Sequence, residues 1–197
     1  MKTFNLATVA IAVFAMFSIV SSPATAQTAY KTGARSQMTL AGTSTLHDWT
    51  MIAKSFNTNA SITVSPDNQI TGISSLTMTL PVTNLKSEKD GLNENAWETL
   101  EYEDHKNITF KMTSAKVTPA GGNKFQITAV GNLTIAGNTK PVTLQSNAVL
   151  NADGSLTCTG SLPIKLSQFN IERPSFMFGT MSVGDAMTLS YNVVLVK

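Results

Sequence analysis

Hydrophobic and polar residues alternate along most of the chain after residue 35. In the clearest stretch, Leu76, Met78, Leu80 and Val82 alternate with threonine and proline residues. Neighbouring side chains of a β-strand point to opposite faces, so a period of two predicts a strand with one apolar and one polar face. Similar runs predict strands near residues 38–40, 46–53, 62–64, 108–113, 125–129, 142–150, 156–164 and 187–195.

Short segments rich in glycine, proline, asparagine and aspartate separate these runs. They occupy residues 65–68, 119–123, 136–138 and 151–154. Each segment is short enough to join neighbouring antiparallel strands. The pattern therefore predicts an all-β chain of about eight or nine meandering strands, which is typical of a sandwich or a closed barrel.

Residues 90–105 break the alternation. Leu92, Ala96, Trp97 and Leu100 recur there at helical spacing among clustered charges. This spacing predicts one amphipathic α-helix that lays Trp97 against the strands and covers an end of a barrel. The carboxylates of the segment are expected to be solvated and not to form a buried acid–base pair.

The first 26 residues have the composition of a secretory signal peptide. Lys2 precedes an apolar run over residues 6–20, and the small residues Ala24 and Ala26 mark a cleavage site before Gln27. The run is shorter than the roughly 20 residues of a membrane-spanning helix and no stop-transfer charges follow it, so no stable membrane anchor is expected. Residues 27–197 are then one domain in the periplasm or outside the cell, large enough for a hydrophobic core.

Composition excludes several classes of function. The net charge is +2 with scattered basic residues, which gives no footprint for nucleic acid. Cys158 is the single cysteine, so an intramolecular disulfide and a cysteine-rich metal site are excluded, and its thiol is expected to be a small buried group on a strand. His47 and His105 lack the spacing of a metal pair, and no glycine-rich phosphate loop opens a helix, so neither a metal nor a cofactor is expected.

Ser44, His47 and Asp48 are the residue types of a nucleophilic triad. On a strand, however, His47 and Asp48 would point to opposite faces, and Ser44 lacks the glycine-flanked turn of a nucleophile. We therefore expect a turn followed by a strand that buries Trp49, and no enzymatic activity.

A barrel of alternating strands can also lie in a membrane, with its apolar side chains outward and aromatic girdles at both interfaces. Here aromatic residues make up only 7% of the chain, lysine and asparagine interrupt the strands, and several runs are too short to cross a bilayer. The sequence favours a soluble barrel with an apolar interior. Eight strands give an interior that side chains fill or that holds one small ligand, so both alternatives stay open.

Four stretches of the chain carry recognisable motifs: residues 42–49 (GTSTLHDW), the helix leading into residues 107–111 (NITFK), residues 131–142 (GNLTIAGNTKPV) and residues 174–185 (PSFMFGTMSVGD). Together they resemble the YceI-like family of lipid- or polyisoprenoid-binding proteins. The stretches occur in the family's order and cover nearly all of the mature chain. The resemblance implies a lipocalin-like, antiparallel, eight-stranded β-barrel with one helix, exported to the periplasm, that holds an isoprenoid such as a quinone tail or a polyprenyl phosphate.

The chain departs from many members of this family at two places. They carry an arginine- and histidine-containing stretch where residues 89–94 read KDGLNE, and a proline where Asn107 precedes the Ile-Thr-Phe strand. These departures bear on the contacts to a head group. A phosphate head would need a cation or free backbone N–H groups at the mouth of the barrel. The candidate cations are Arg173, beside Pro174, and Lys140.

We therefore expect a carrier that sequesters or shuttles an isoprenoid or another long-chain lipid. Apolar burial at about 25 cal/mol per Å² would supply most of the affinity, so no cofactor is needed beyond the lipid itself. The alternative is a ligand-free structural or protein-interaction barrel of the cell envelope, and a homodimer is left open. The apolar candidates for contact with the lipid are Leu76, Met78, Leu80, Phe110, Met112, Phe125, Ile127, Val142, Leu144, Phe176, Phe178, Met181 and Tyr191.

Overall fold

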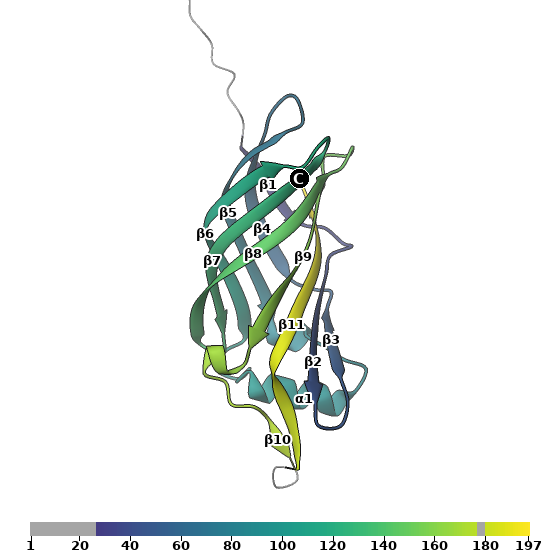
Figure 1. The fold of residues 1–197 in the computed structure, drawn as a ribbon, viewed down its shortest axis with the longest axis vertical. Coiled ribbons are helices and arrows are strands. Elements are labelled where there is room, and N and C mark those ends of the chain that lie inside the picture. The colour runs from purple at the N-terminus through teal and green to yellow at the C-terminus, as the bar shows by residue number, and fades with distance from the viewer. Residues whose placement is uncertain (1–26, 177–179) are drawn as a thin grey trace, which may run out of the picture.

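The computed structural model describes residues 27–176 and 180–197 (Figure 1). The expected signal peptide and Phe178 lie outside these residues. The helical elements are η1 (Val82–Asn84), α1 (Asp90–Thr99) and η2 (Ser167–Phe169). The strands are β1 (Gln27–Thr32), β2 (Gln37–Ser44), β3 (Trp49–Ala53), β4 (Asn57–Val64), β5 (Ile70–Pro81), β6 (Asn107–Pro119), β7 (Lys124–Ile135), β8 (Asn138–Leu150), β9 (Leu156–Lys165), β10 (Ser175–Phe176) and β11 (Met181–Val196).

The strands form one curved sheet whose first and last members meet. Among the described residues, eight antiparallel strands follow one another in the order β1-β4-β5-β6-β7-β8-β9-β11, and β11 pairs again with β1. Two residue pairs, Lys31 with Val196 and Thr32 with Leu195, close the ring. This arrangement confirms the predicted all-β, lipocalin-like, eight-stranded barrel.

β2 and β3 extend the wall toward the end of the barrel that carries α1 (Figure 1). β1 and β2 lie along the same edge of β11, and the turn at residues 33–36 separates them. In this turn the buried Ser36 hydroxyl donates to the carbonyl oxygen of Val194 at 3.1 Å and accepts from its N–H at 3.0 Å. The hydroxyl replaces the ladder hydrogen bonds that the turn interrupts.

The wall is only partly laddered at two places in the described chain. β5 pairs with β6 only over residues 77–81 and 107–111, and the other residues of these two strands do not pair with one another. β8 pairs with β9 over residues 146–150 and 156–160, so the first half of β8 separates from the second half of β9. The barrel is therefore closed more tightly on some sides than on others.

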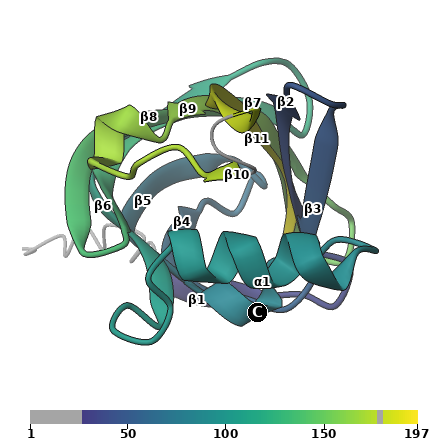
Figure 2. The same cartoon turned by 90° about the horizontal axis from the view of Figure 1, so that it is seen from below.

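α1 lies across the end of the barrel opposite the C-terminus (Figures 1 and 2). The Trp97 ring packs against the core, and its indole N–H donates to the carbonyl oxygen of Leu85 at 2.9 Å. The helix thus covers the barrel end and holds Trp97 against the strands, as predicted.

The helix ends at Thr99, earlier than the predicted residue 105. The N–H of Tyr102 bonds to the carbonyl of Trp97 at 3.1 Å, and the N–H of Glu101 bonds to the carbonyl of Glu98 at 2.9 Å. Glu101 lies in the left-handed region with a φ of 52°. This is the Schellman arrangement, in which glycine usually occupies the left-handed position. Because a glutamate stands there, the sequence carries no visible stop signal.

The predicted turns join the strands as expected, with two differences among the strands. Ala136 and Gly137, with φ values of 44° and 70°, form the tight turn between β7 and β8. β3 begins at Trp49 and not at residue 46. The Ser44 hydroxyl accepts hydrogen bonds from the N–H groups of Leu46 at 3.3 Å and His47 at 3.2 Å, so these residues form a turn before the strand. The alternation in the sequence does not reveal β1 or β10, because β1 buries one large side chain, Tyr30, and β10 has only two residues.

Candidate ligand-binding site

The described part of the barrel contains three apolar cavities. The first, of about 110 Å³, is surrounded by side chains of β2, β4 to β9 and β11. The second, of about 70 Å³, lies beside η2 and is bordered by Leu166 and Phe169. The third, of about 90 Å³, lies beneath α1 and is bordered by Leu92 and Ala96.

The three cavities lie in a row, because consecutive cavities share wall residues. The side chains between the first and the second are Met38, Met78, Leu133 and Leu189. The side chains between the second and the third are Leu40, Leu85, Leu100, Leu166 and Met187. An apolar path interrupted by these residues therefore leads from the barrel interior to α1. We call this path the lumen row.

The fold brings eight of the predicted lipid-contacting side chains together along the lumen row. Met78 borders both the first and the second cavity, and Leu80 borders the second. The others that border the first cavity are Leu76, Phe110, Ile127, Val142, Leu144 and Tyr191.

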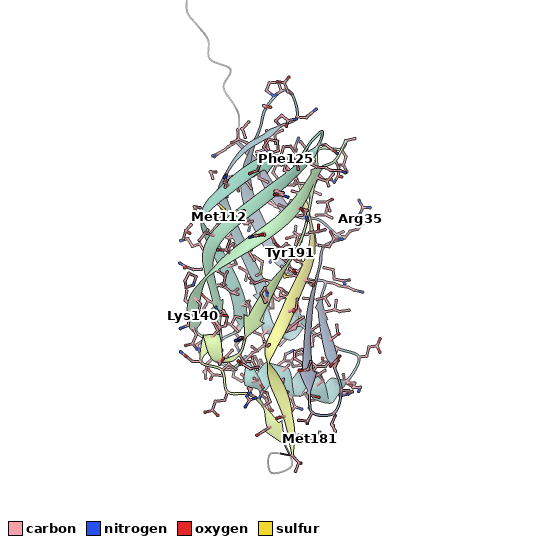
Figure 3. All side chains as sticks on the ribbon, in the orientation of Figure 1. Arg35, Met112, Phe125, Lys140, Met181 and Tyr191 are labelled. Atoms are coloured by element: carbon pink, nitrogen blue, oxygen red, sulfur yellow. The ribbon has the colours of Figure 1, made fainter. Side chains whose placement is uncertain are left out.

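The remaining apolar candidates lie elsewhere. Phe125 is 1% exposed and belongs to the packed core, and Met112 packs against that core; neither borders a cavity of the row. Figure 3 shows Phe125 toward the C-terminal end of the barrel and Met181 toward the opposite tip. Phe176 lies in β10, which pairs it with Met181. Their contact with a lipid stays a prediction.

The two predicted cations also lie off the lumen row. Lys140 is half-buried on β8, and Arg173 is exposed in the loop after η2. Neither side chain borders any of the three cavities. Their role toward a head group therefore has no geometric support along the row.

A polar bridge crosses the wall of the first cavity where the β8–β9 ladder ends. The Tyr191 hydroxyl donates to the carbonyl oxygen of Gln145 at 3.0 Å and lies 2.9 Å from the Ser146 hydroxyl. Burial raises the pKa of the Tyr191 hydroxyl, so this group is a neutral donor. The bridge ties β11 to β8 across Gly160 of β9, which pairs with both.

Cys158 borders the first cavity between Ala148 of β8 and Val193 of β11. Burial raises the pKa of its thiol to about 12. The thiolate is the nucleophilic form of cysteine, so this side chain is an inert wall residue at physiological pH.

Several wall residues were not among the predicted candidates. Met38, Leu133 and Leu189 lie on strands whose alternation is visible in the sequence. Every second residue of a strand faces the same side, so counting in steps of two from a known inward residue identifies them. Thr58 is harder to find, because it is a polar residue on the inward face of β4. The signal is that Thr58 continues the inward series of Ala60 and Ile62.

A polar groove of about 680 Å³ adjoins the third cavity on the outside of the barrel. Trp49 and Leu92 border both spaces, so the groove meets the end of the lumen row. Its basic side chains are Lys54, Lys86 and Lys89, and the Lys89 ammonium lies 3.0 Å from the ring nitrogen Nε2 of His47. Asp48 and Glu88 also line the groove, so its charge is mixed.

Ser44, His47 and Asp48 do not form the contacts of a triad in the described structure. The Ser44 hydroxyl donates to the backbone carbonyl of His47 at 2.8 Å and not to its imidazole. The described residues contain no group of three or more His, Cys, Asp or Glu side chains placed to hold a metal ion. No helix within the described ranges is both long and apolar enough to cross a membrane.

The chain is similar to several solved structures. BcnA from Burkholderia cenocepacia has 25% sequence identity and a TM-score of 0.63, with 82% of this chain and 96% of BcnA covered. A polyisoprenoid binding domain from Saccharophagus degradans, implicated in plant cell wall breakdown, has 9% identity and a TM-score of 0.66, covering 86% of this chain and 98% of that domain. The YceI protein of Campylobacter jejuni has 20% identity and a TM-score of 0.51, covering 71% and 81%. The last two show the fold alone.

No match was found among curated protein sequences. A family profile of the YceI-like domain, however, matches residues 32–195. This match extends from the last residue of β1 to the penultimate residue of β11. The chain therefore belongs to the YceI-like family.

Proposed function

We propose that this protein binds an isoprenoid or a similar long-chain lipid in the lumen row and sequesters or carries it in the periplasm. The observation that carries the proposal is the row of three apolar cavities. A chain-like ligand needs such a row, whereas a compact ligand needs one cavity. The similar domain from Saccharophagus degradans is described as polyisoprenoid binding, which supports this ligand class.

The lumen row must widen when a chain enters. An apolar cavity of about 150 Å³ holds one benzene, so the first cavity, at about 110 Å³, offers room for roughly one isoprene unit. Met38 and Met78 help to separate it from the second cavity, and Met187 helps to separate the second from the third. Methionine side chains are unbranched and adapt readily. Rotamer changes of these three residues would widen the passages between the cavities without moving the strands.

Apolar burial would supply most of the affinity, at about 25 cal/mol for each Å² removed from water. Along such a path few polar groups position the ligand, so we expect loose selectivity for the length and unsaturation of the chain. A quinone tail and a polyprenyl phosphate both fit this description. Binding of this kind requires no catalytic residue, and we assign none.

Native protein gives the first test. Mature protein purified from the periplasm of its host should release a long-chain apolar molecule on organic extraction, identified by mass spectrometry at a stoichiometry near one. Consistently empty protein, with the cavities filled by side chains, would contradict the proposal and favour the ligand-free structural or protein-interaction barrel.

A matched pair of substitutions on β7 gives the second test. Ala129 is 3% exposed and borders the first cavity, whereas its neighbour Val130 is 37% exposed and faces outward. Ala129→Phe should reduce bound lipid at least about tenfold, because the ring takes the space of roughly one isoprene unit and each buried carbon contributes about 0.8 kcal/mol. Val130→Phe should retain the lipid. Equal lipid content in the two variants would show that the lipid lies outside the lumen row.

A further inference from the structure

One hydroxyl of the first cavity is left without a hydrogen bond. Thr58 is 6% exposed and borders this cavity. Its backbone N–H is satisfied, because it donates to the Thr32 hydroxyl at 2.6 Å. Its own side-chain oxygen Oγ1 is buried and finds no hydrogen-bond partner within the described structure. A buried hydroxyl without a partner destabilises a protein, so such groups are rare and call for an explanation.

The other polar groups around the first cavity are engaged or weak. The hydroxyls of Tyr191 and Ser146 are paired, and that of Tyr191 also donates to the carbonyl of Gln145. Burial keeps the Cys158 thiol protonated by raising its pKa to about 12, and a thiol is a weak donor. Thr58 therefore carries the strong donor that remains unpaired along this part of the described wall. Because its Oγ1 has almost no accessible surface, it can reach a ligand only after the side chain rotates toward the cavity.

The first cavity also lacks charged wall residues in the part of the chain that the structure describes. Burial of an ionised group without a counter-charge is strongly unfavourable, so an anionic head group would not be stable there. A neutral oxygen needs only one hydrogen-bond donor. Lysines occur further along. Lys165 borders the second cavity but is exposed on β9, and Lys54, Lys86 and Lys89 line the groove outside the third cavity.

Thr58 lies near the passage from the first to the second cavity. Thr58 pairs across the β4–β5 ladder with Met78, one of the side chains between the first and the second cavity. The second and third cavities continue from this point toward α1. A ligand whose polar end lies at Thr58 can therefore extend its apolar chain along the row.

We propose that Thr58 is a ligand-binding residue whose Oγ1 donates a hydrogen bond to a neutral oxygen, a hydroxyl or a carbonyl, at the polar end of the lipid. This inference rests on the proposed lipid-binding function and deepens it. The polar end lies in the first cavity, and the chain runs toward α1. The bound lipid is then a prenyl alcohol, phenol or quinone type of molecule, and its head group is uncharged.

The test compares three probes with identical chains: geranylgeraniol, the hydrocarbon in which a methyl group replaces its CH₂OH group, and geranylgeranyl phosphate. Each is titrated into delipidated protein. Wild type should bind the alcohol about five- to tenfold more tightly than the hydrocarbon, the effect of about one net hydrogen bond. Thr58→Val, which keeps the shape and removes the hydroxyl, should abolish this preference and leave the affinity for the hydrocarbon within about twofold.

Two variants control for shape and position. Thr58→Ser keeps the hydroxyl and should keep the preference for the alcohol. Thr77→Val removes an exposed hydroxyl from the neighbouring strand β5 and should behave as wild type. The melting temperature of delipidated Thr58→Val should equal or exceed that of wild type, because the variant loses an unsatisfied buried group. If Thr58→Val fails to fold, the unpaired state of the hydroxyl is wrong and the proposal is overturned.

The remaining outcomes separate this proposal from the function on which it rests. If wild type binds none of the three probes, lipid binding itself is contradicted. If wild type binds them and Thr58→Val weakens alcohol and hydrocarbon equally, or weakens neither, the role of Thr58 is overturned while lipid binding stands. A preference for the phosphate that Thr58→Val leaves unchanged would place the head group in the outer groove and would also overturn it.

Discussion

Gly160 leaves room for the side chain that bridges the barrel wall. A Cβ atom at this position would collide with the Tyr191 hydroxyl and with the carbonyl oxygen of Gln145. The β8–β9 ladder ends at the pair of Ser146 and Gly160, so the next carbonyl, that of Gln145, receives its hydrogen bond from Tyr191. The glycine therefore serves a contact between side chain and backbone, and not a turn.

Replacement of this glycine should be costly. Gly160→Ala forces Tyr191 away from Gln145 and should lower the free energy of unfolding by about 1–3 kcal/mol, the usual range for overpacking. Gly72→Ala on β5 is the matched control, because a Cβ there meets no atom within 4 Å. Urea denaturation measures both variants. Equal stability of the two would show that the wall does not depend on the Tyr191 bridge.

Cys158 should make stability fall at alkaline pH. Its pKa is raised from 9.0 to about 12 by burial. Below pH 9.0 the folded and unfolded states both keep the proton, so the thiol contributes no pH dependence. Between pH 9.0 and about 12 the unfolded state loses the proton first. The free energy of unfolding of wild type should therefore fall by about 1.4 kcal/mol per pH unit relative to Cys158→Ala. Parallel pH profiles for the two proteins would contradict this burial.

Sequence periodicity predicts strands well where burial alternates strictly. Each long strand from β5 onward is recognisable because its inward side chains are apolar. β1 is not recognisable from the sequence, because it buries little more than Tyr30. Its backbone pairing with β4 and β11 holds it in the barrel instead. The sequence also does not reveal where α1 ends. The helix is terminated by the left-handed backbone at Glu101, and glutamate has no preference for that conformation.

η2 depends on one carboxylate. Asp185 of β11 accepts hydrogen bonds from the backbone N–H and the hydroxyl of Ser167 at 2.8 and 2.7 Å, and these bonds lower its pKa. Leu166 and Phe169, on either side of Ser167, border the second cavity. The carboxylate thus holds in place the segment that closes this side of the lumen row.

Loss of this anchor should speed the release of lipid. Asp185→Ala should raise the dissociation rate about five- to tenfold, measured as transfer of a prenyl alcohol to acceptor vesicles, because two hydrogen bonds to a charged group are lost. Glu172→Ala, an exposed carboxylate in the following loop, should leave the rate unchanged. Since the pKa of Asp185 is lowered, the wild-type rate should approach that of Asp185→Ala only as the pH falls below 3.8. Equal rates for both variants above that pH would show that η2 does not gate the row.

The sequence predicts which side chains face inward but not which of them border empty space. Phe125 and Ile127 lie on the same face of β7, yet Phe125 packs solidly and Ile127 borders the first cavity. The difference arises from the residues that meet each of them across the barrel, and these come from strands distant in sequence. For the same reason Thr58 is not recognised as a ligand contact until the cavity around it is known.

The lumen row should act as a measure of chain length. The affinity for prenyl alcohols should rise with each added isoprene unit, at about 0.8 kcal/mol per buried CH₂ as an upper limit, until the three cavities are filled. Met187→Phe narrows the passage between the second and the third cavity and should stop this rise at a shorter chain. Thr188→Phe, exposed on the opposite face of β11, should not. If Met187→Phe leaves the affinity for long chains unchanged, the tail must leave the barrel before it reaches α1, through a wall where β5 and β6 or β8 and β9 are unpaired.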